Sequence, residues 1–217
     1  MYYIIGDIHG DLSKLQNLLQ KVLKNFDSER DTMLFLGDYI DRGNFGFETI
    51  AFLINLSEKI NTVFLLGNHE DMFYDYIQGE NRELFLYNGG EKTVRSYKRN
   101  TGSETPPESH RKFYRELKLI HEADDFVAAH AGLNPDLNIC DQQKDDVIWI
   151  REKFYNSPRC WSKTVIFGHT PVSHFRGEPG IYFDSSRNII GIDNGIIYGR
   201  PLACLRWPDK KVYYSGA

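Results

Sequence analysis

Residues 37–43 have the sequence Gly-Asp-Tyr-Ile-Asp-Arg-Gly and follow directly after the apolar run Met33-Leu34-Phe35-Leu36. An apolar run that stops at Gly-Asp places the carboxylate of Asp38 at the carboxyl end of a buried strand, where open α/β sheets bind their ligands. The turn adds a second acid, Asp41, and a guanidinium group, Arg42. One such turn is weak evidence, because Asp and Gly are common in turns and helix caps. The chain, however, repeats this plan.

The same order of strand, polar loop and helix occurs before and after this turn. The apolar run Tyr2–Ile5 leads into Asp7 and His9, and the run Thr62–Leu66 leads into Gly67-Asn68-His69-Glu70, each followed by a predicted helix. On its own, the first loop is equally consistent with a helix cap at Asp7 and a loop histidine at His9. Three such units in succession predict parallel strands whose loops lie at one edge of the sheet. That edge should bring together Asp7, His9, Asp38, Asn68 and His69.

Later apolar runs continue the pattern. Phe126–Ala129 is followed by His130, Thr164–Phe167 leads to His169, and an apolar segment between them ends at Arg151. Four short, turn-separated runs near the carboxyl terminus predict an antiparallel meander or second sheet: Gly180–Phe183, Ile189–Asp193, Ala203–Trp207 and Lys211–Tyr214.

Residues 79–124 interrupt this order with polar sequence that is predicted to be helical and looping. We interpret the segment as an excursion over the site that gives substrate selectivity, within a single domain spanning residues 1–217. Four of its basic residues fit either a solvated helix face or a substrate patch, namely Lys92, Arg95, Lys98 and Arg99.

The bulk composition is that of an ordinary soluble enzyme, with 217 residues, 41% hydrophobic and 26% charged, and a formal net charge of −4. This balance gives no basic field for a stable nucleic-acid partner. Three cysteines without a CxxC pair, Cys140, Cys160 and Cys204, suggest no disulfide framework and fit a reduced cytosol. With no targeting segment and no apolar run near the roughly 18 residues of a membrane span, we expect a cytoplasmic protein without a membrane partner. No feature indicates an oligomeric state.

The residues at the strand ends form a predicted metal-binding set of carboxylates, one amide oxygen and imidazoles: Asp7, Asp38, Asn68, His9, His130 and His169. Mixed oxygen and nitrogen donors without a thiolate suit Mn, Fe or Zn. Six donors exceed what one catalytic ion with an open position takes. We therefore expect two divalent ions that share one carboxylate, with Mn as the first choice.

Two ions with two carboxylate ligands leave a surplus positive charge that suits a phosphate group. Arg42 and Arg151 add planar guanidinium groups for the outer phosphate oxygens. A water bridging the ions becomes a hydroxide nucleophile near neutral pH. His69 is free to protonate the leaving oxygen, and Asp41 is placed to hydrogen-bond that imidazole. These four side chains are the predicted catalytic residues.

Five motifs in series resemble the signature set of the phosphoprotein phosphatase family of binuclear metallophosphoesterases. They are Gly-Asp-Ile-His-Gly (6–10), Gly-Asp-Tyr-Ile-Asp-Arg-Gly (37–43), Gly-Asn-His-Glu (67–70), His-Ala-Gly (130–132) and Gly-His-Thr-Pro (168–171). The resemblance implies an α/β fold in which a two-sheet β sandwich is flanked by helices, the calcineurin-like metallophosphoesterase fold.

The resemblance also implies separate roles for the site residues. The first ion would be held by Asp7, His9 and Asp38, and the second by Asp38, Asn68, His130 and His169. His69 with Asp41 would form the general-acid pair, and Arg42 and Arg151 would hold the phosphate.

The resemblance implies two substrate classes. The compact length and Asn88-Gly89-Gly90 resemble small bacterial and phage serine/threonine protein phosphatases, so we expect phosphoserine, phosphothreonine and also phosphotyrosine in proteins as substrates. The segment from Gly191 to Ala203 is similar to one in diadenosine tetraphosphatases, although Asn194 and Arg200-Pro201 depart from it. Hydrolysis of a bis(5'-nucleosyl) tetraphosphate is therefore the alternative. A non-catalytic protein-binding scaffold is a third alternative, because one fold can host several functions.

Overall fold

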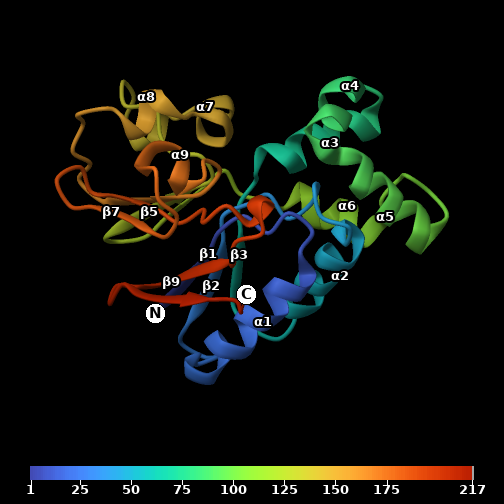
Figure 1. The fold of residues 1–217 in the computed structure, drawn as a ribbon, viewed down its shortest axis with the longest axis horizontal. Coiled ribbons are helices and arrows are strands. Elements are labelled where there is room, and N and C mark those ends of the chain that lie inside the picture. Colours follow the sequence, from blue (N-terminus) through green and yellow to red (C-terminus); the bar gives the residue numbers. More distant parts are fainter. Residues whose placement is uncertain (217) are drawn as a thin grey trace.

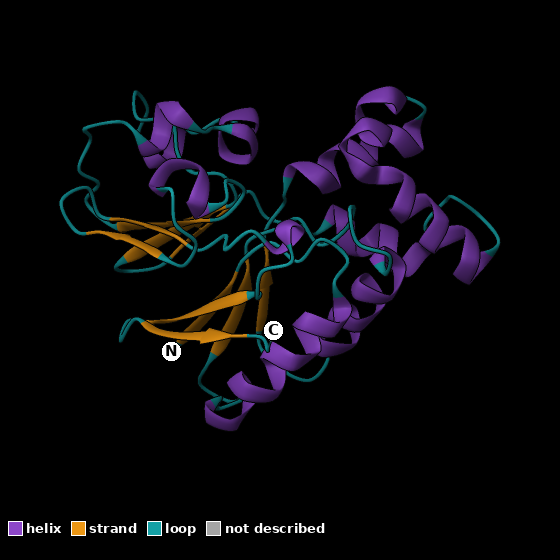
Figure 2. Cartoon of the chain, viewed as in Figure 1, coloured by secondary structure: helices purple, strands orange, loops and turns teal. Residues whose placement is uncertain are grey.

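The structure is a computed structural model that describes residues 1–216. Over this range the chain forms two five-stranded sheets, with helices above one sheet and beside the other (Figure 1). Figure 2 shows the two sheets in orange, one above the other, with the helices in purple outside them. The predicted α/β fold with a two-sheet β sandwich flanked by helices is confirmed.

The first sheet contains the amino-terminal strands and a returning hairpin. Its order is β10-β9-β1-β2-β3, with bounds Lys211–Tyr214, Ala203–Trp207, Tyr2–Ile5, Thr32–Phe35 and Thr62–Phe64. Strands β1, β2 and β3 are parallel, as predicted, whereas β9 runs antiparallel to both β1 and β10. The loops that follow the three parallel strands therefore leave the sheet at one edge.

The second sheet has the order β4-β5-β6-β8-β7, with bounds Ile120–Glu122, Phe126–Ala129, Thr164–Phe167, Ile189–Gly191 and Tyr182–Asp184. Strands β5, β6 and β8 are parallel, and β4 and β7 are antiparallel edges. The sequence predicts that the last four strands form an antiparallel meander or a second sheet. A single meander is wrong, and the second sheet holds for β7 and β8 alone, because β9 and β10 return to the first sheet. Both β8 and β9 are buried on their two faces, which suits an interior place in a sheet for each.

The helices cover the outer faces of the sheets. α1 (Leu12–Val22) and α2 (Gly46–Ser57) pack on the first sheet, and α7 (Lys144–Trp149), α8 (Glu152–Tyr155) and α9 (Val172–Arg176) on the second. A further layer contains α3 (Asn68–Gln78), α4 (Arg82–Phe85), the π-helical turn η2 (Leu86–Gly90), α5 (Glu91–Thr101) and α6 (Glu108–Arg115). Short helical turns are η1 (Leu23–Asn25), η3 (Ile139–Asp141) and η4 (Ile196–Tyr198). None of the helices in residues 1–216 is long and apolar enough to cross a membrane.

The predicted excursion over residues 79–124 contains α4, η2, α5 and α6, and its last residues form β4. Helix α5 packs against α2, so this segment is attached to the helices of the first sheet. Figure 1 shows the excursion in green, beside α2 and α3.

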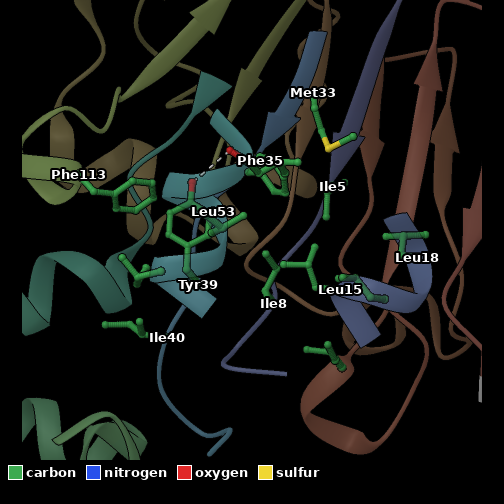
Figure 3. Close-up of a cluster of buried hydrophobic side chains, with 14 of the residues drawn as sticks. Ile5, Ile8, Leu15, Leu18, Met33, Phe35, Tyr39, Ile40, Leu53 and Phe113 are labelled. Carbon is green, nitrogen blue, oxygen red and sulfur yellow. Dashed lines mark hydrogen bonds between the residues drawn. The ribbon is translucent and has the colours of Figure 1, made fainter. Parts of the chain in front are cut away.

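Alternating side chains of the strands divide the core into layers. One set lies between the two sheets and includes Ile4, Leu34, Phe126, Ile166 and Leu205. The opposite face of the first sheet packs on α1 and α2, where Ile5, Met33 and Phe35 meet Leu15, Leu18 and Leu53 (Figure 3). Tyr39 extends this cluster from the loop after β2 and donates its hydroxyl to the carbonyl of Leu65 at 2.7 Å. Packing on both sides of β2 thereby fixes the position of the loop 37–43.

Candidate active site

The predicted site residues follow the carboxyl ends of five strands drawn from both sheets. Asp7 and His9 follow β1, Asp38 follows β2, Asn68 and His69 begin α3 just after β3, His130 follows β5 and His169 follows β6. All of these side chains are buried, with at most 6% of any residue exposed. The parallel pairing within each sheet is what brings these loops to one place.

Asp38 lies at the centre of two groups of donor atoms. Its Oδ1 is 3.4 Å from Nε2 of His130, and its Oδ2 is 3.6 Å from Nε2 of His9. The metal-capable atoms of Asp38, His130 and His169 lie within 4.8 Å of one another, and so do those of His9, Asp38 and His69. The two carboxylate oxygens of Asp38 thus face different sets of imidazoles, which is the arrangement expected of a shared ligand.

The hydrogen bonds of His9 and His130 leave their Nε2 atoms without a proton. Nδ1–H of His9 donates to the carbonyl of Ile40 at 3.1 Å, and Nδ1–H of His130 donates to the carbonyl of Leu36 at 2.9 Å. In each ring Nε2 therefore carries a lone pair, which is the form that binds metals.

Several metal-capable atoms then converge around Nε2 of His130. Nε2 of His130 lies 3.0 Å from Oδ1 of Asn68 and 3.4 Å from Oδ1 of Asp38, and all three atoms are acceptors. Nδ1 of His169 lies 3.2 Å from the same Nε2 of His130. Buried acceptors that face one another are unfavourable unless a cation lies among them. These donors therefore fit a divalent metal that prefers oxygen and nitrogen ligands.

The protonation of the site agrees with this fit. Burial lowers the pKa of His9 to about 3, and burial also lowers the pKa values of His130 and His169, so these rings are neutral. Burial alone would raise the pKa of Asp38, but the surrounding imidazoles hold that pKa below its ordinary value, so the carboxylate is ionised. Neutral imidazole and ionised carboxylate are the ligand forms.

Asp7 makes a different contact from the other predicted ligands. Both of its carboxylate oxygens accept the backbone N–H of His169, at 3.0 and 3.1 Å. Burial and the nearby carboxylates of Asp193 and Asp38 raise the pKa of Asp7 well above its usual value. A cation beside Asp7 would offset this repulsion. Binding of the first ion by Asp7 stays a prediction.

The loop 37–43 is held in an uncommon backbone conformation. The φ values of Asp38, Asp41 and Arg42 are positive, at 52°, 68° and 64°. A residue other than Gly adopts such a backbone conformation at a cost of about 1 kcal/mol or more. The carboxylate of Glu70 opposes this cost by accepting four backbone N–H groups, from Asp38 and Tyr39 at 2.8 Å, Gly67 at 3.2 Å and Ile40 at 3.3 Å. Glu70 therefore supports the site, and it was not singled out from the sequence although it belongs to the motif at 67–70.

Gly67 is required where the loops after β2 and β3 meet. A Cβ atom at residue 67 would lie 2.3 Å from Oδ1 of Asp38, much closer than two atoms can approach. A side chain here would displace the shared carboxylate.

The predicted proton donor and its partner are in direct contact. Nδ1 of His69 lies 2.6 Å from Oδ2 of Asp41, and both side chains are buried. Thr93 of α5 donates its hydroxyl to Oδ1 of Asp41 at 2.5 Å and accepts the backbone N–H of Asp41 at 2.9 Å. Burial raises the pKa of Asp41, and the hydrogen bonds from His69 and Thr93 oppose that rise. Thr93 is a second residue that the sequence reasoning missed, and it links the excursion to the site.

The two predicted phosphate-binding arginines line one pocket with these groups. The pocket has a volume of about 160 Å³, and its walls include Asp38, Arg42, Asn68, His69, Arg151 and His169. Nη1 of Arg151 donates to the hydroxyl of Thr170 at 3.0 Å, which orients the guanidinium group. Further residues on the pocket wall, not assigned to the site from the sequence, include Asn88, Trp149, His174 and Tyr198. A phosphate group placed here would contact both arginines and the metal-capable donors.

A family model described as calcineurin-like phosphoesterase matches residues 2–191. The chain belongs to the calcineurin-like phosphoesterase family. The resemblance noted from the five motifs is thereby confirmed, and the chain is a hydrolase of the metallophosphoesterase class.

Relatives of this phosphoesterase include enzymes named for nucleotide hydrolysis. The symmetrical bis(5'-nucleosyl)-tetraphosphatase of Vibrio campbellii (strain ATCC BAA-1116) is 25% identical over 99% of this chain and 98% of its own length. The asymmetrical bis(5'-nucleosyl)-tetraphosphatase PrpE of Bacillus thuringiensis (strain Al Hakam) is 30% identical over 96% of this chain and 91% of its own length.

Solved structures share the fold of this phosphoesterase at lower identity. A candidate diadenosine tetraphosphatase superposes with a TM-score of 0.73 at 23% identity, over 98% of this chain and 91% of the other. A cold-active protein tyrosine phosphatase gives a TM-score of 0.67 at 18% identity, over 94% of this chain and 73% of the other. A serine/threonine phosphatase from Saccharomyces cerevisiae gives 0.64 at 14% identity, over 100% and 79%. At these identities the likeness shows the fold alone.

Proposed function

We propose that this phosphoesterase hydrolyses a phosphoanhydride bond of a bis(5'-nucleosyl) tetraphosphate such as diadenosine tetraphosphate. The observation that best supports a phosphate substrate is the pocket that Arg42, Arg151 and His69 line together with the donor groups around Asp38. The choice of a nucleotide over a phosphoprotein is supported by relatives of that name whose similarity extends over almost the whole chain.

Two divalent ions, with Mn as the first choice, would be held by the buried donors. In this proposal Asp7, His9 and Asp38 hold one ion, and Asp38, Asn68, His130 and His169 hold the other. When bound, such ions lower the pKa of a water and offset the charge of the phosphate.

The remaining steps belong to side chains of this chain. The guanidinium groups of Arg42 and Arg151 bind the outer oxygens of the phosphate under attack. As the oxygen of a water forms a new P–O bond and the water releases a proton to solvent, the P–O bond to the leaving group breaks, and His69 donates a proton to the leaving oxygen. Asp41 orients the imidazole of His69 through the 2.6 Å contact.

A second substrate class is favoured by one feature of the excursion. Tyr87 is 90% exposed and is followed by Asn88, which lines the active-site pocket. An exposed aromatic side chain next in the sequence to a pocket residue suits contact with a protein substrate. Dephosphorylation of phosphoserine, phosphothreonine or phosphotyrosine in proteins is therefore the second candidate.

The two candidates are separated by one comparison. The same preparation, supplied with Mn²⁺, is assayed for kcat/KM with diadenosine tetraphosphate and with a phosphoserine and a phosphotyrosine peptide. We expect the nucleotide to be preferred by about a hundredfold or more, a difference of ~3 kcal/mol in transition-state stabilisation. A preference for either peptide would reject the nucleotide proposal in favour of the second candidate.

A further inference from the structure

A second pocket lies beside the active-site pocket and shares two of its walls. It has a volume of about 350 Å³, and Arg42 and Ile197 line both pockets. A volume of this size is within the range of small-molecule sites, roughly 300–1,000 Å³. The two pockets therefore meet at the guanidinium group that is proposed to hold the phosphate.

The second pocket lies on the side of the proton donor. His9 is part of its wall, and the ring of His9 packs edge-on against the ring of His69 with centroids 4.8 Å apart. A group that leaves the attacked phosphorus and receives a proton from His69 would thus depart toward this pocket.

The charge of the second pocket suits a phosphate chain. Lys14, Arg42 and Lys92 line it, and Asp11 is the carboxylate in its wall, 3.3 Å from Nζ of Lys14. Lys92 forms no ion pair with any residue in 1–216. By contrast, Lys98 pairs with Glu104 and Arg99 pairs with Glu48, each at 2.7 Å. Of the four basic residues of the excursion named in the sequence analysis, Lys92 is the one that lines this pocket and is free to bind an anion.

One wall of the second pocket is apolar. Phe45 leaves 46% of its surface exposed, and Ile196 and Ile197 of η4 lie in the same wall. An exposed aromatic ring beside cations can stack on a base while the cations bind the phosphates.

We propose that this second pocket, lined by Lys14, Arg42, Phe45 and Lys92, binds the leaving nucleoside di- or triphosphate of the substrate. Its phosphates contact Arg42, Lys14 and Lys92, and its base packs on Phe45. This assignment rests on the proposed nucleotide substrate and adds the orientation in which that substrate binds.

The test uses ADP as the probe and inhibition as the readout. Hydrolysis of p-nitrophenyl phosphate by the Mn²⁺-supplied enzyme is inhibited with ADP and, separately, with orthophosphate, at constant free Mn²⁺. We expect the wild-type enzyme to bind ADP about tenfold or more tightly than orthophosphate, because orthophosphate fills the first pocket alone. Equal inhibition constants for the two ligands would overturn the proposal.

Variants assign the difference to the second pocket. Lys92→Met should lower the ratio of the two inhibition constants about fivefold, as expected for the loss of one partly exposed charge contact. The matched control Lys98→Met should retain the wild-type ratio, because Lys98 lies outside the pocket. Phe45→Ala should weaken inhibition by ADP but not by methylenediphosphonate, which has no base. A wild-type ratio in both Lys92→Met and Lys14→Met would reject the pocket.

Failure of this inference can be told apart from failure of the proposed function. Turnover of diadenosine tetraphosphate does not enter the inhibition ratio. If the protein hydrolyses the tetraphosphate but the lysine variants keep the wild-type ratio of inhibition constants, the proposed function stands and the proposed role of the second pocket is rejected. If Lys92→Met lowers the preference for ADP but the protein does not hydrolyse the tetraphosphate, the second pocket binds the nucleotide and the proposed function is rejected.

Discussion

The carboxylate of Asp41 lies 2.6 Å from Nδ1 of His69 and holds that imidazole with Nε2 turned toward Asp38, 3.9 Å from its Oδ2. An imidazole oriented by a buried carboxylate can protonate a leaving oxygen. We expect His69→Asn to reduce kcat for an alkyl phosphate by about 10²–10⁴-fold but to affect p-nitrophenyl phosphate much less, because nitrophenolate leaves without a proton. Equal losses on both substrates, with metal content unchanged, would show that His69 has another role.

Thr93 supports the same pair from outside the motifs. Thr93→Val removes the hydroxyl that donates to Asp41 and should lower kcat for an alkyl phosphate about tenfold, with little change in KM and a smaller effect on the aryl phosphate. Thr93→Ser retains the hydroxyl and should restore kcat. A merely structural role would reduce the rates with both substrates by the same factor, since it would only lower the amount of folded enzyme.

Glu70 should contribute to the stability of the loop 37–43. Glu70→Gln replaces a carboxylate that accepts four N–H groups with an amide that has one acceptor oxygen, so buried donors lose partners. We expect the free energy of unfolding in urea to fall by about 2 kcal/mol or more. The matched substitution Glu83→Gln at an exposed position of α4 should change it by less than about 0.5 kcal/mol. An equal effect of the two substitutions would contradict the role given to Glu70.

His110 should make stability depend on pH in the acid range. It is buried, its Nδ1 lies 2.8 Å from the hydroxyl of Tyr97, and burial lowers its pKa from 6.5 to about 4. Between those two pH values the unfolded chain binds a proton that the folded chain does not, so stability falls as pH falls from 6.5 toward 4. His110→Gln should reduce the slope of Tm against pH in this range. An unchanged slope would mean that the other buried histidines account for it.

Much of the site could be predicted because its residues follow parallel strands. An apolar run leads into each of four metal-capable side chains, Asp38, Asn68, His130 and His169. Parallel strands place such side chains at one edge of the sheet. The pairing of the last four strands could not be predicted in the same way. β8 and β9 are both short and apolar, so their sequences do not tell which sheet each one joins. That choice depends on contacts with distant parts of the chain, which bury both faces of β8 in the second sheet and both faces of β9 in the first.

Residues that support the site from a distance were the hardest to predict. Thr93 lies 52 residues from Asp41 along the chain, and a threonine in a polar helix carries no chemical signal of its own. Lys92 and Lys98 are the same residue type on the same helix, so the sequence does not distinguish them. They differ because α5 turns Lys92 toward a pocket and Lys98 toward Glu104. Glu70 could have been found, since a buried acid beside strained loops needs backbone donors.

We propose that the donors around Asp38 hold two divalent ions that are needed for hydrolysis. The most direct measurement is the metal content of the purified chain after equilibration with Mn²⁺ and removal of free metal, by inductively coupled plasma mass spectrometry, for the wild type and for Asp38→Asn. We predict about two ions per wild-type chain, in keeping with a two-metal site, and a loss of bound metal together with phosphatase activity in Asp38→Asn. A wild-type chain that hydrolyses phosphate esters with no bound metal, or an Asp38→Asn variant with full metal content and activity, would contradict the claim.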